Sequence, residues 1–223
     1  MTLKMPKLRR IFLISFLVEL IGFAVISSLP IHDLALYRSF KSTDSAIVSQ
    51  PFFPMWLSIF PHNLEIASIE FIPVVGILMF GFSIGATASV IAIEGTATNI
   101  NGFAIFASLM LLPHSWLELP AYAVAASTSI YILYYLITKK LKANYMKIVY
   151  MYLFVVIELA FAGAIETSEI LLEESPHPFY AFYMWIPAIP IIIFLIWLYR
   201  HLDANEYKPK KEKEYDEYDF NQF

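Results

Sequence analysis

Two glutamates stand within long apolar stretches, where an ionised side chain is costly. Glu19 lies in the run 11–29 and Glu158 in the run 148–165. At about 1.5 Å of helix rise per residue, both fall near the middle of a bilayer. An ionised carboxylate there costs about 2.5–3.5 kcal/mol even on insertion scales. Each glutamate therefore either joins helices through hydrogen bonds or faces a proton or cation pathway, and the sequence leaves both readings open.

A second group of polar residues flanks the starts of two other expected helices. His114 and Glu118 are four residues apart, so they share a helix face and can interact. Histidine and carboxylate are zinc ligands, but the His-Glu-x-x-His motif is absent, which favours a structural cluster over a metal site. The whole group comprises His62, Asn63, Glu65, Glu70, His114 and Glu118.

Several kinds of chemistry are excluded or unsupported. The chain has no cysteine, which excludes disulfides, thiolate metal sites and cysteine nucleophiles. It has no phosphate-binding glycine loop, no nucleophile elbow and no basic face for nucleic acid. We therefore predict no catalytic residues, no cofactor, no metal and no nucleic-acid partner.

Composition indicates the fold class. Hydrophobic residues make up 59% of the 223 residues and charged residues 15%, against about 25% charged in soluble domains. The charges gather at the ends of the apolar runs. This pattern predicts an all-α, polytopic transmembrane helical bundle, with membrane lipid as its first partner.

Six crossings account for the apolar runs. The run 64–93 is longer than a bilayer requires, so it must tilt, protrude or break, with Pro73 and Gly76 among the candidate positions. The segment 103–112 crosses only if its helix begins earlier. In the alternative, 64–98 holds two crossings and 103–112 is re-entrant, which gives the same parity. The expected spans are 11–29, 64–93, 99–112, 116–137, 148–165 and 181–199.

Basic residues predict the orientation. They cluster before the first span, between Lys139 and Lys147, and from Arg200 onward. Under the positive-inside rule, these segments and both termini are cytoplasmic in the plasma membrane. The connection 30–62 and the acidic loop 166–174 then lie outside. The tail 203–223 is charged and is expected to be disordered.

Small residues at a spacing of four mark one expected helix-packing face. Gly81, Gly85 and Ser89 follow the small-xxx-small pattern, which lets two helix backbones approach closely. The pattern fits a contact within the chain or a contact between two copies.

Two segments resemble the stage II sporulation protein M family. In that family an Asn-Asn pair opens a long helix that ends in Asn-Gly, and here His62-Asn63 and Glu94-Gly95 occupy those positions. A later family helix opens with Pro-His-Gly and continues with Glu-Leu-Pro-Ala. The run 112–121, Leu-Pro-His-Ser-Trp-Leu-Glu-Leu-Pro-Ala, matches except that Ser115 replaces glycine.

The run Phe161–Thr167, with Glu166, also resembles the end of a family helix, so the resemblance covers about residues 59–170. It implies a membrane scaffold in a complex that remodels the cell wall, with the hydrolases as separate proteins. Its expected partners are further copies of the chain or other envelope membrane proteins.

Two other functions stay open. The first is a transporter or permease subunit moving protons, ions or a small solute through Glu19 and Glu158, because unpaired intramembrane acids and broken helices are typical of such proteins. The second is an intramembrane metal-dependent hydrolase that uses His62, His114 and Glu118.

Overall fold

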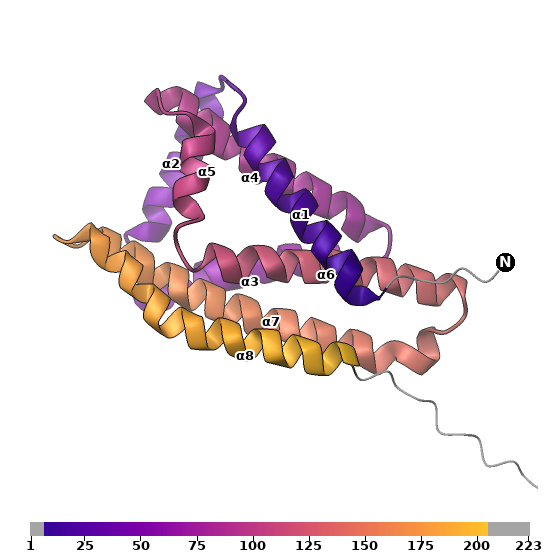
Figure 1. Ribbon diagram of the computed structural model, residues 1–223. Coiled ribbons are helices and arrows are strands. Elements are labelled where there is room, and N and C mark those ends of the chain that lie inside the picture. The colour runs from indigo at the N-terminus through magenta and orange to yellow at the C-terminus, as the bar shows by residue number, and fades with distance from the viewer. Residues whose placement is uncertain (1–6, 205–223) are drawn as a thin grey trace, which may run out of the picture.

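The computed structural model describes residues 7–204, and all their regular structure is helical (Figure 1). This confirms the all-α class. The predicted tail lies outside the described residues except for its first two positions, which end the last helix. The elements are α1 (Leu8–Ser27), α2 (Leu34–Val48), α3 (Phe52–Glu70), α4 (Val75–Thr98), α5 (Gly102–Leu109), α6 (Ser115–Ile137), α7 (Leu141–Glu173), the 3₁₀ helix η1 (Pro178–Met184) and α8 (Trp185–Ala204).

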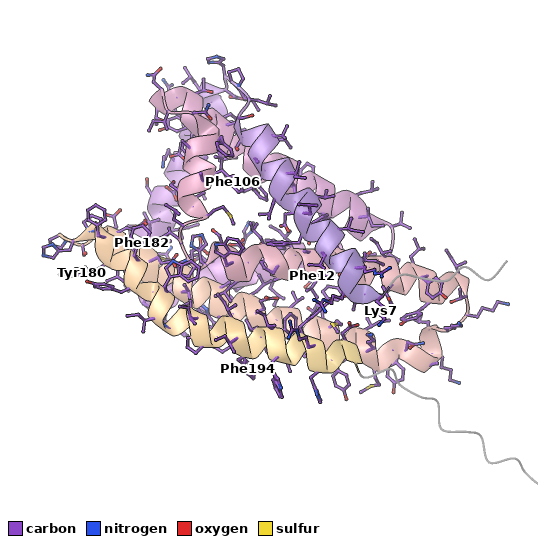
Figure 2. The ribbon with its side chains drawn as sticks, in the orientation of Figure 1. Lys7, Phe12, Phe106, Tyr180, Phe182 and Phe194 are labelled. Carbon is purple, nitrogen blue, oxygen red and sulfur yellow. The ribbon has the colours of Figure 1, made fainter. Side chains whose placement is uncertain are left out.

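Five helical segments are long and apolar enough to cross a membrane. They are α1, α4, α6, α7 and the segment Pro178–Asp203, which joins η1 to α8. Large apolar side chains on these helices point away from the bundle, as Phe194 does on α8 (Figure 2). Such an apolar exterior is stable in lipid but not in water. The chain is therefore a multi-pass membrane protein.

The run 64–93 is two helices, so the prediction of one span there was wrong. Residues 71–74 form a turn between α3 and α4, at the Pro73 position that the sequence marked as a possible break. Proline lacks the amide hydrogen that would continue the helix. Val74 then adopts a positive φ of 69°, which is rare for a β-branched residue and reverses the chain direction. The helix α3 starts at Phe52, inside the expected connection.

Gly76 makes this turn possible. A Cβ atom on Gly76 would lie 1.9 Å from the carbonyl oxygen of Glu70 and 2.9 Å from the Ser129 hydroxyl. The backbone of α4 therefore starts in direct contact with the end of α3. Ser129 on α6 also donates a hydrogen bond to the carbonyl of Ile72, at 2.9 Å, and so binds the turn to the centre of the bundle.

The segment 99–112 does not form the expected span. Its helix, α5, has eight residues, which at about 1.5 Å per residue is far shorter than the hydrocarbon core. The helix does not begin earlier because Asn101 caps its N-terminus, where its side chain accepts a hydrogen bond from Phe103 N at 2.8 Å. Two indoles then anchor the turn that follows: Trp116 donates to Met110 O and Trp185 donates to Leu111 O, both at 2.9 Å.

The chain crosses the length of the bundle repeatedly, and three basic segments meet at one end. Figure 1 shows that the start of α1, the α6–α7 turn and the end of α8 lie together, while α2 and α5 lie at the opposite end. An ion pair of 3.0 Å between Lys147 and Asp203 joins α7 to α8 at the first end. Below, this end is called the terminal end, and the other is called the α2–α5 end.

Gly81 and Gly85 of the expected glycine packing face have no partner in the described part of the chain. No heavy atom of the described residues lies within 4 Å of a Cβ placed on Gly81 or Gly85. Backbones instead approach closely where α4 meets α5. There, a Cβ on Gly95 would lie 2.6 Å from Gly102 N, and one on Gly102 would lie 2.2 Å from Ser27 O. A contact of Gly81, Gly85 and Ser89 with a second copy stays a prediction.

Candidate functional site

A polar cavity of about 710 Å³ lies among seven helices, α1 to α7. It occupies the half of the bundle toward the α2–α5 end, because both of these short helices contribute to its wall. Side chains that can ionise reach it from five helices. These residues are Glu19, Asp44, His62, His114, Glu118, Tyr122 and Glu166.

The cavity is acidic. Four of its lining residues carry carboxylates, namely Glu19, Asp44, Glu118 and Glu166, and no lysine or arginine occurs among the described residues that line it. Asp44 is paired with Lys41 at 3.5 Å, whereas Glu19, Glu118 and Glu166 have no lysine or arginine partner among the described residues. Carboxylates of this kind attract cations and exclude anions. Electrostatics therefore favour a proton or a metal cation as the occupant.

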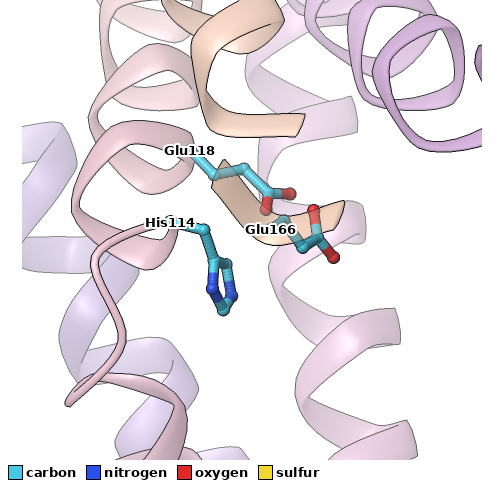
Figure 3. A group of neighbouring side chains, drawn as sticks. All are labelled: His114, Glu118 and Glu166. Atoms are coloured by element: carbon cyan, nitrogen blue, oxygen red, sulfur yellow. The ribbon is translucent and has the colours of Figure 1, made fainter. Parts of the chain in front are cut away.

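Three side chains converge in the cavity. One potential ligand atom each from His114, Glu118 and Glu166 lies within 4.8 Å of the other two. Figure 3 shows the histidine and Glu118 on the first turns of α6 and Glu166 on the facing helix, α7. The spacing of four residues brings His114 and Glu118 to one face of α6, as the sequence predicts.

The imidazole of His114 is oriented by a carboxylate from α7. Its Nδ1 atom forms a short hydrogen bond with Glu169, whose other oxygen lies 3.4 Å from the backbone nitrogen of His114. Glu169 is 1% exposed, so the pair is shielded. The second ring nitrogen, Nε2, lies 3.3 Å from the Ser115 hydroxyl. That hydroxyl donates its single proton to the carbonyl of Leu109 at 2.9 Å, so it donates none to Nε2. Nε2 thus remains available to a proton or a metal ion.

Glu118 is oriented within its own helix. The Tyr122 hydroxyl, one turn later, donates to one oxygen of Glu118 at 3.0 Å. The second carboxylate oxygen of Glu118 accepts no hydrogen bond from the described residues of the site. Since Tyr122 also lines the cavity, the aromatic ring and the carboxylate form one continuous wall.

Glu19 is the most enclosed acid of the cavity. Only 1% of its surface is exposed, and its Oε2 atom has no hydrogen-bond partner among the described residues. The charged residues that interact electrostatically with it are Glu70 and Glu118, both acidic. A buried carboxylate oxygen without a donor is strongly unfavourable unless a proton or a cation accompanies it.

A model of the family described as stage II sporulation protein M matches residues 11–168, more than half of the chain. The chain belongs to this family. The match extends beyond the predicted 59–170 toward the N-terminus, so α1 and Glu19 are part of the family region. No curated protein and no solved structure matches the chain.

The family motifs contribute several of the polar residues that line this cavity. His62 and Asn63 line it from α3, and His114 with Glu118 line it from α6. Glu70 is fully buried beside it and accepts a hydrogen bond from Ser83 at 2.9 Å, while the other oxygen of Glu70 has no described partner. Glu65 is exposed and does not line the cavity.

The Glu94-Gly95 pair of the family motif has a separate position at the α2–α5 end. Glu94 forms an ion pair of 2.9 Å with Lys41 on α2. The hydrogen bond to Glu94 raises the pKa of Lys41. Gly95 packs against Gly102, as described above, so this motif binds α2 and α5 to the end of α4.

Glu19 and Glu158, which the sequence grouped together, lie in different places. Glu158 lines a second cavity of about 500 Å³ between α1, α6, α7 and α8, among mostly apolar side chains. It is 5% exposed, and its Oε2 atom has no described partner. Arg9 and Arg200 line the same cavity at the terminal end.

Sequence reasoning placed Glu166 and Glu169 in an outer loop, which was wrong. The helix α7 continues for 33 residues to Glu173, so both side chains are part of the helical bundle. Their spacing of three residues puts them on one helix face. That spacing is the signal that could have identified them, together with the family-like run that contains Glu166.

Proposed function

We propose that this family member is a permease subunit that moves protons or other cations through the acidic cavity. One observation carries the proposal. The described lining of the cavity includes four carboxylates, two histidines and no lysine or arginine. Intramembrane acids are rare because of their desolvation cost, and they most often mark ion or proton routes.

The arrangement of the acids supports a route rather than isolated bonds between helices. Glu19 interacts electrostatically with Glu70 and with Glu118, and Glu166 interacts with Glu118. A carboxylate that only joins helices accepts hydrogen bonds from a partner helix. The Oε2 atom of Glu19 accepts none from the described residues.

We also propose six crossings with both termini in the cytoplasm. The sixth crossing is α3, whose 19 residues extend about 28 Å at 1.5 Å per residue, close to the hydrocarbon thickness of about 30 Å. The support is that the start of α1, the α6–α7 turn and the end of α8 lie together (Figure 1), and that these segments, with the start of α7 after the turn, carry Arg9, Lys147 and Arg200. Under the positive-inside rule this end is cytoplasmic, and the cavity then belongs to the outer half.

A flux assay tests the cation route. Purified protein in liposomes should dissipate an imposed proton or cation gradient faster than empty liposomes do. Glu19→Gln should reduce that flux to the background rate, because glutamine cannot exchange a proton. Glu158→Gln is the matched control, since that buried acid lies outside the acidic cavity, and it should keep most of the flux. Wild-type flux equal to that of empty liposomes would reject the proposal.

The second candidate is a scaffold in an envelope complex, which the family resemblance implies. The position of α8 favours it. This helix packs on α7 and η1, and its other face carries exposed Ile186, Ile193 and Trp197. Cross-linking in membranes before detergent extraction separates the two candidates. A scaffold yields a defined complex with another membrane protein or a second copy and shows no flux.

A further inference from the structure

We propose that the cavity binds a divalent transition-metal ion through His114, Glu118 and Glu166. The inference deepens the proposed function, because it names the class of cation and rests on that function for the role of the ion. The binding itself is argued from the side chains alone.

The three side chains have the composition and spacing of a metal site. A four-coordinate ion with bonds of about 2.0–2.2 Å separates its ligand atoms by about 3.3–3.6 Å. The ligand atoms of the three residues already lie within 4.8 Å of one another, so small side-chain rotations bring them into range. All three come from two rigid helices that pack together, which limits the geometry that the site can adopt.

Neighbouring groups orient two of the three ligands. Glu169 binds Nδ1 of His114 and so presents Nε2 as the ligand atom. Tyr122 donates to one oxygen of Glu118 and leaves the other for the ion. Carboxylate–histidine pairs and hydrogen-bonded carboxylates of this kind commonly support metal ligands in proteins.

An independent observation points to a cation at this position. Glu19 lines the same cavity, is 1% exposed, and has an Oε2 atom without a described hydrogen-bond partner. The Oε2 atom of Glu166 also has none. Each of these buried carboxylate oxygens is unfavourable unless a proton or a cation accompanies it. A divalent ion between Glu118 and Glu166 would satisfy Glu166 and would be balanced in charge by these two carboxylates, while Glu19 lies in the same cavity.

The donor set defines the class of ion. One imidazole with carboxylate oxygens suits Zn²⁺, Mn²⁺ or Fe²⁺, whereas Ca²⁺ and Mg²⁺ prefer oxygen alone. The chain has no cysteine, so thiolate sites for softer ions are excluded. Zn²⁺ and Mn²⁺ are the probes that we choose.

Equilibrium binding to the full chain in detergent tests the site. The protein is stripped with a chelator, dialysed against Zn²⁺ or Mn²⁺, and assayed for bound metal by mass spectrometry and titration calorimetry. We expect one ion per chain in the wild type and loss of stoichiometric binding in Glu118→Gln and Glu166→Gln. Glu158→Gln, a buried acid outside the cavity, should bind like the wild type.

A milder variant guards against misfolding of the ligand variants. Tyr122→Phe removes only the hydroxyl that orients Glu118, and it should weaken binding by about 10–100-fold without changing the elution volume or the melting temperature. Metal-free wild-type protein after dialysis overturns the inference. So does wild-type affinity in folded Glu118→Gln and Glu166→Gln, because it would mean that the ion binds elsewhere.

The outcomes also separate the inference from the proposed function. Protein that conducts protons but binds neither Zn²⁺ nor Mn²⁺ overturns the metal site and leaves the cation route. Protein that binds one ion at these ligands but conducts nothing supports the site and rejects the permease.

Discussion

Glu169 on α7 binds the imidazole of His114, which lies 55 residues earlier in the chain at the start of α6. This contact sets the orientation of the one nitrogen ligand in the acidic cavity. It also joins the two helices that supply all three proposed metal ligands.

Glu169→Gln should therefore weaken metal binding without removing a ligand. Glutamine keeps the shape of the side chain but not its charge, so the histidine ring loses its ionic partner. Binding of Zn²⁺ should weaken by about 10–100-fold. Titration calorimetry on the purified variant measures the change. The control is Glu174→Gln, an exposed acid at the end of the same helix, and an equal effect of both variants would contradict a specific role for Glu169.

Glu19→Leu should stabilise the fold and stop the flux. The carboxylate has an oxygen without a described partner, and an apolar side chain of similar size removes that desolvation penalty of about 1–3 kcal/mol. Thermal unfolding in detergent should move to a higher temperature. An unchanged or lower melting temperature would indicate that Glu19 makes a stabilising interaction in the bilayer.

Much of the membrane architecture follows from the sequence. Four predicted spans, 11–29, 116–137, 148–165 and 181–199, correspond to α1, α6, α7 and the segment Pro178–Asp203. Hydropathy predicts these helices because each is long and apolar enough to cross the hydrocarbon core. The helix ends were less accurate: α7 runs from Leu141 to Glu173 because its acids lie inside the bundle rather than in water.

The site was only partly predictable. Helix periodicity pairs His114 with Glu118, but no local pattern brings them to Glu166 and Glu169 of another helix. The grouping of Glu19 with Glu158 came from their equal depth, which says nothing about rotation around the helix axis. Tertiary packing decides that rotation, and it turns the two acids into separate cavities.

Gly76→Ala should destabilise the protein, since its new methyl group would lie 1.9 Å from a backbone oxygen that cannot move aside. We expect a loss of about 1–3 kcal/mol or more, measured as a lower melting temperature in detergent. Gly81→Ala is the matched control on the same helix. Its methyl group meets nothing within 4 Å, so this variant should be neutral or gain up to about 1 kcal/mol. An equal loss in both variants would contradict the tight turn.

Lys41→Gln should release α2 from the end of α4 with little effect on the fold. The ion pair with Glu94 is partly exposed and is worth at most about 1 kcal/mol. No residue of α2 is buried, so little else attaches it. Ser58→Cys, at the wall of the cavity, should then react faster with a water-soluble maleimide. Equal rates with and without Lys41→Gln would contradict this role.

The same pair makes a prediction about pH. The bond to Glu94 raises the pKa of Lys41 above its usual value near 10.5. The stabilisation that the Lys41–Glu94 ion pair gives is therefore complete below the usual lysine pKa. It is lost only as the pH rises through the higher pKa that Lys41 has in the folded protein. In the Ser58→Cys variant that keeps Lys41, the labelling rate should not change with pH between pH 6 and 9, after correction for the reactivity of the thiol itself. A labelling rate that rises with pH within this range when Lys41 is present, but not in Lys41→Gln, would contradict the raised pKa of Lys41.

Single cysteines test the proposed orientation, since the natural chain has none. Ser49→Cys lies between α2 and α3, and Lys140→Cys lies in the α6–α7 turn. An impermeant maleimide applied to intact cells should label the first position and spare the second until the membrane is opened. Labelling of both positions, or of Lys140→Cys alone, would contradict a cytoplasmic terminal end.

The turn at residues 71–74 has a consequence for how the chain enters the bilayer during synthesis. In the proposed six-crossing arrangement, α3 and α4 form a hairpin with only four residues between its arms. The more polar arm, α3, carries Glu65, Glu70 and Pro61 and is synthesised before its strongly apolar neighbour, so we expect the two arms to enter the lipid together. Translocation of Glu70 is thus assisted by α4, the helix whose Ser83 later binds it.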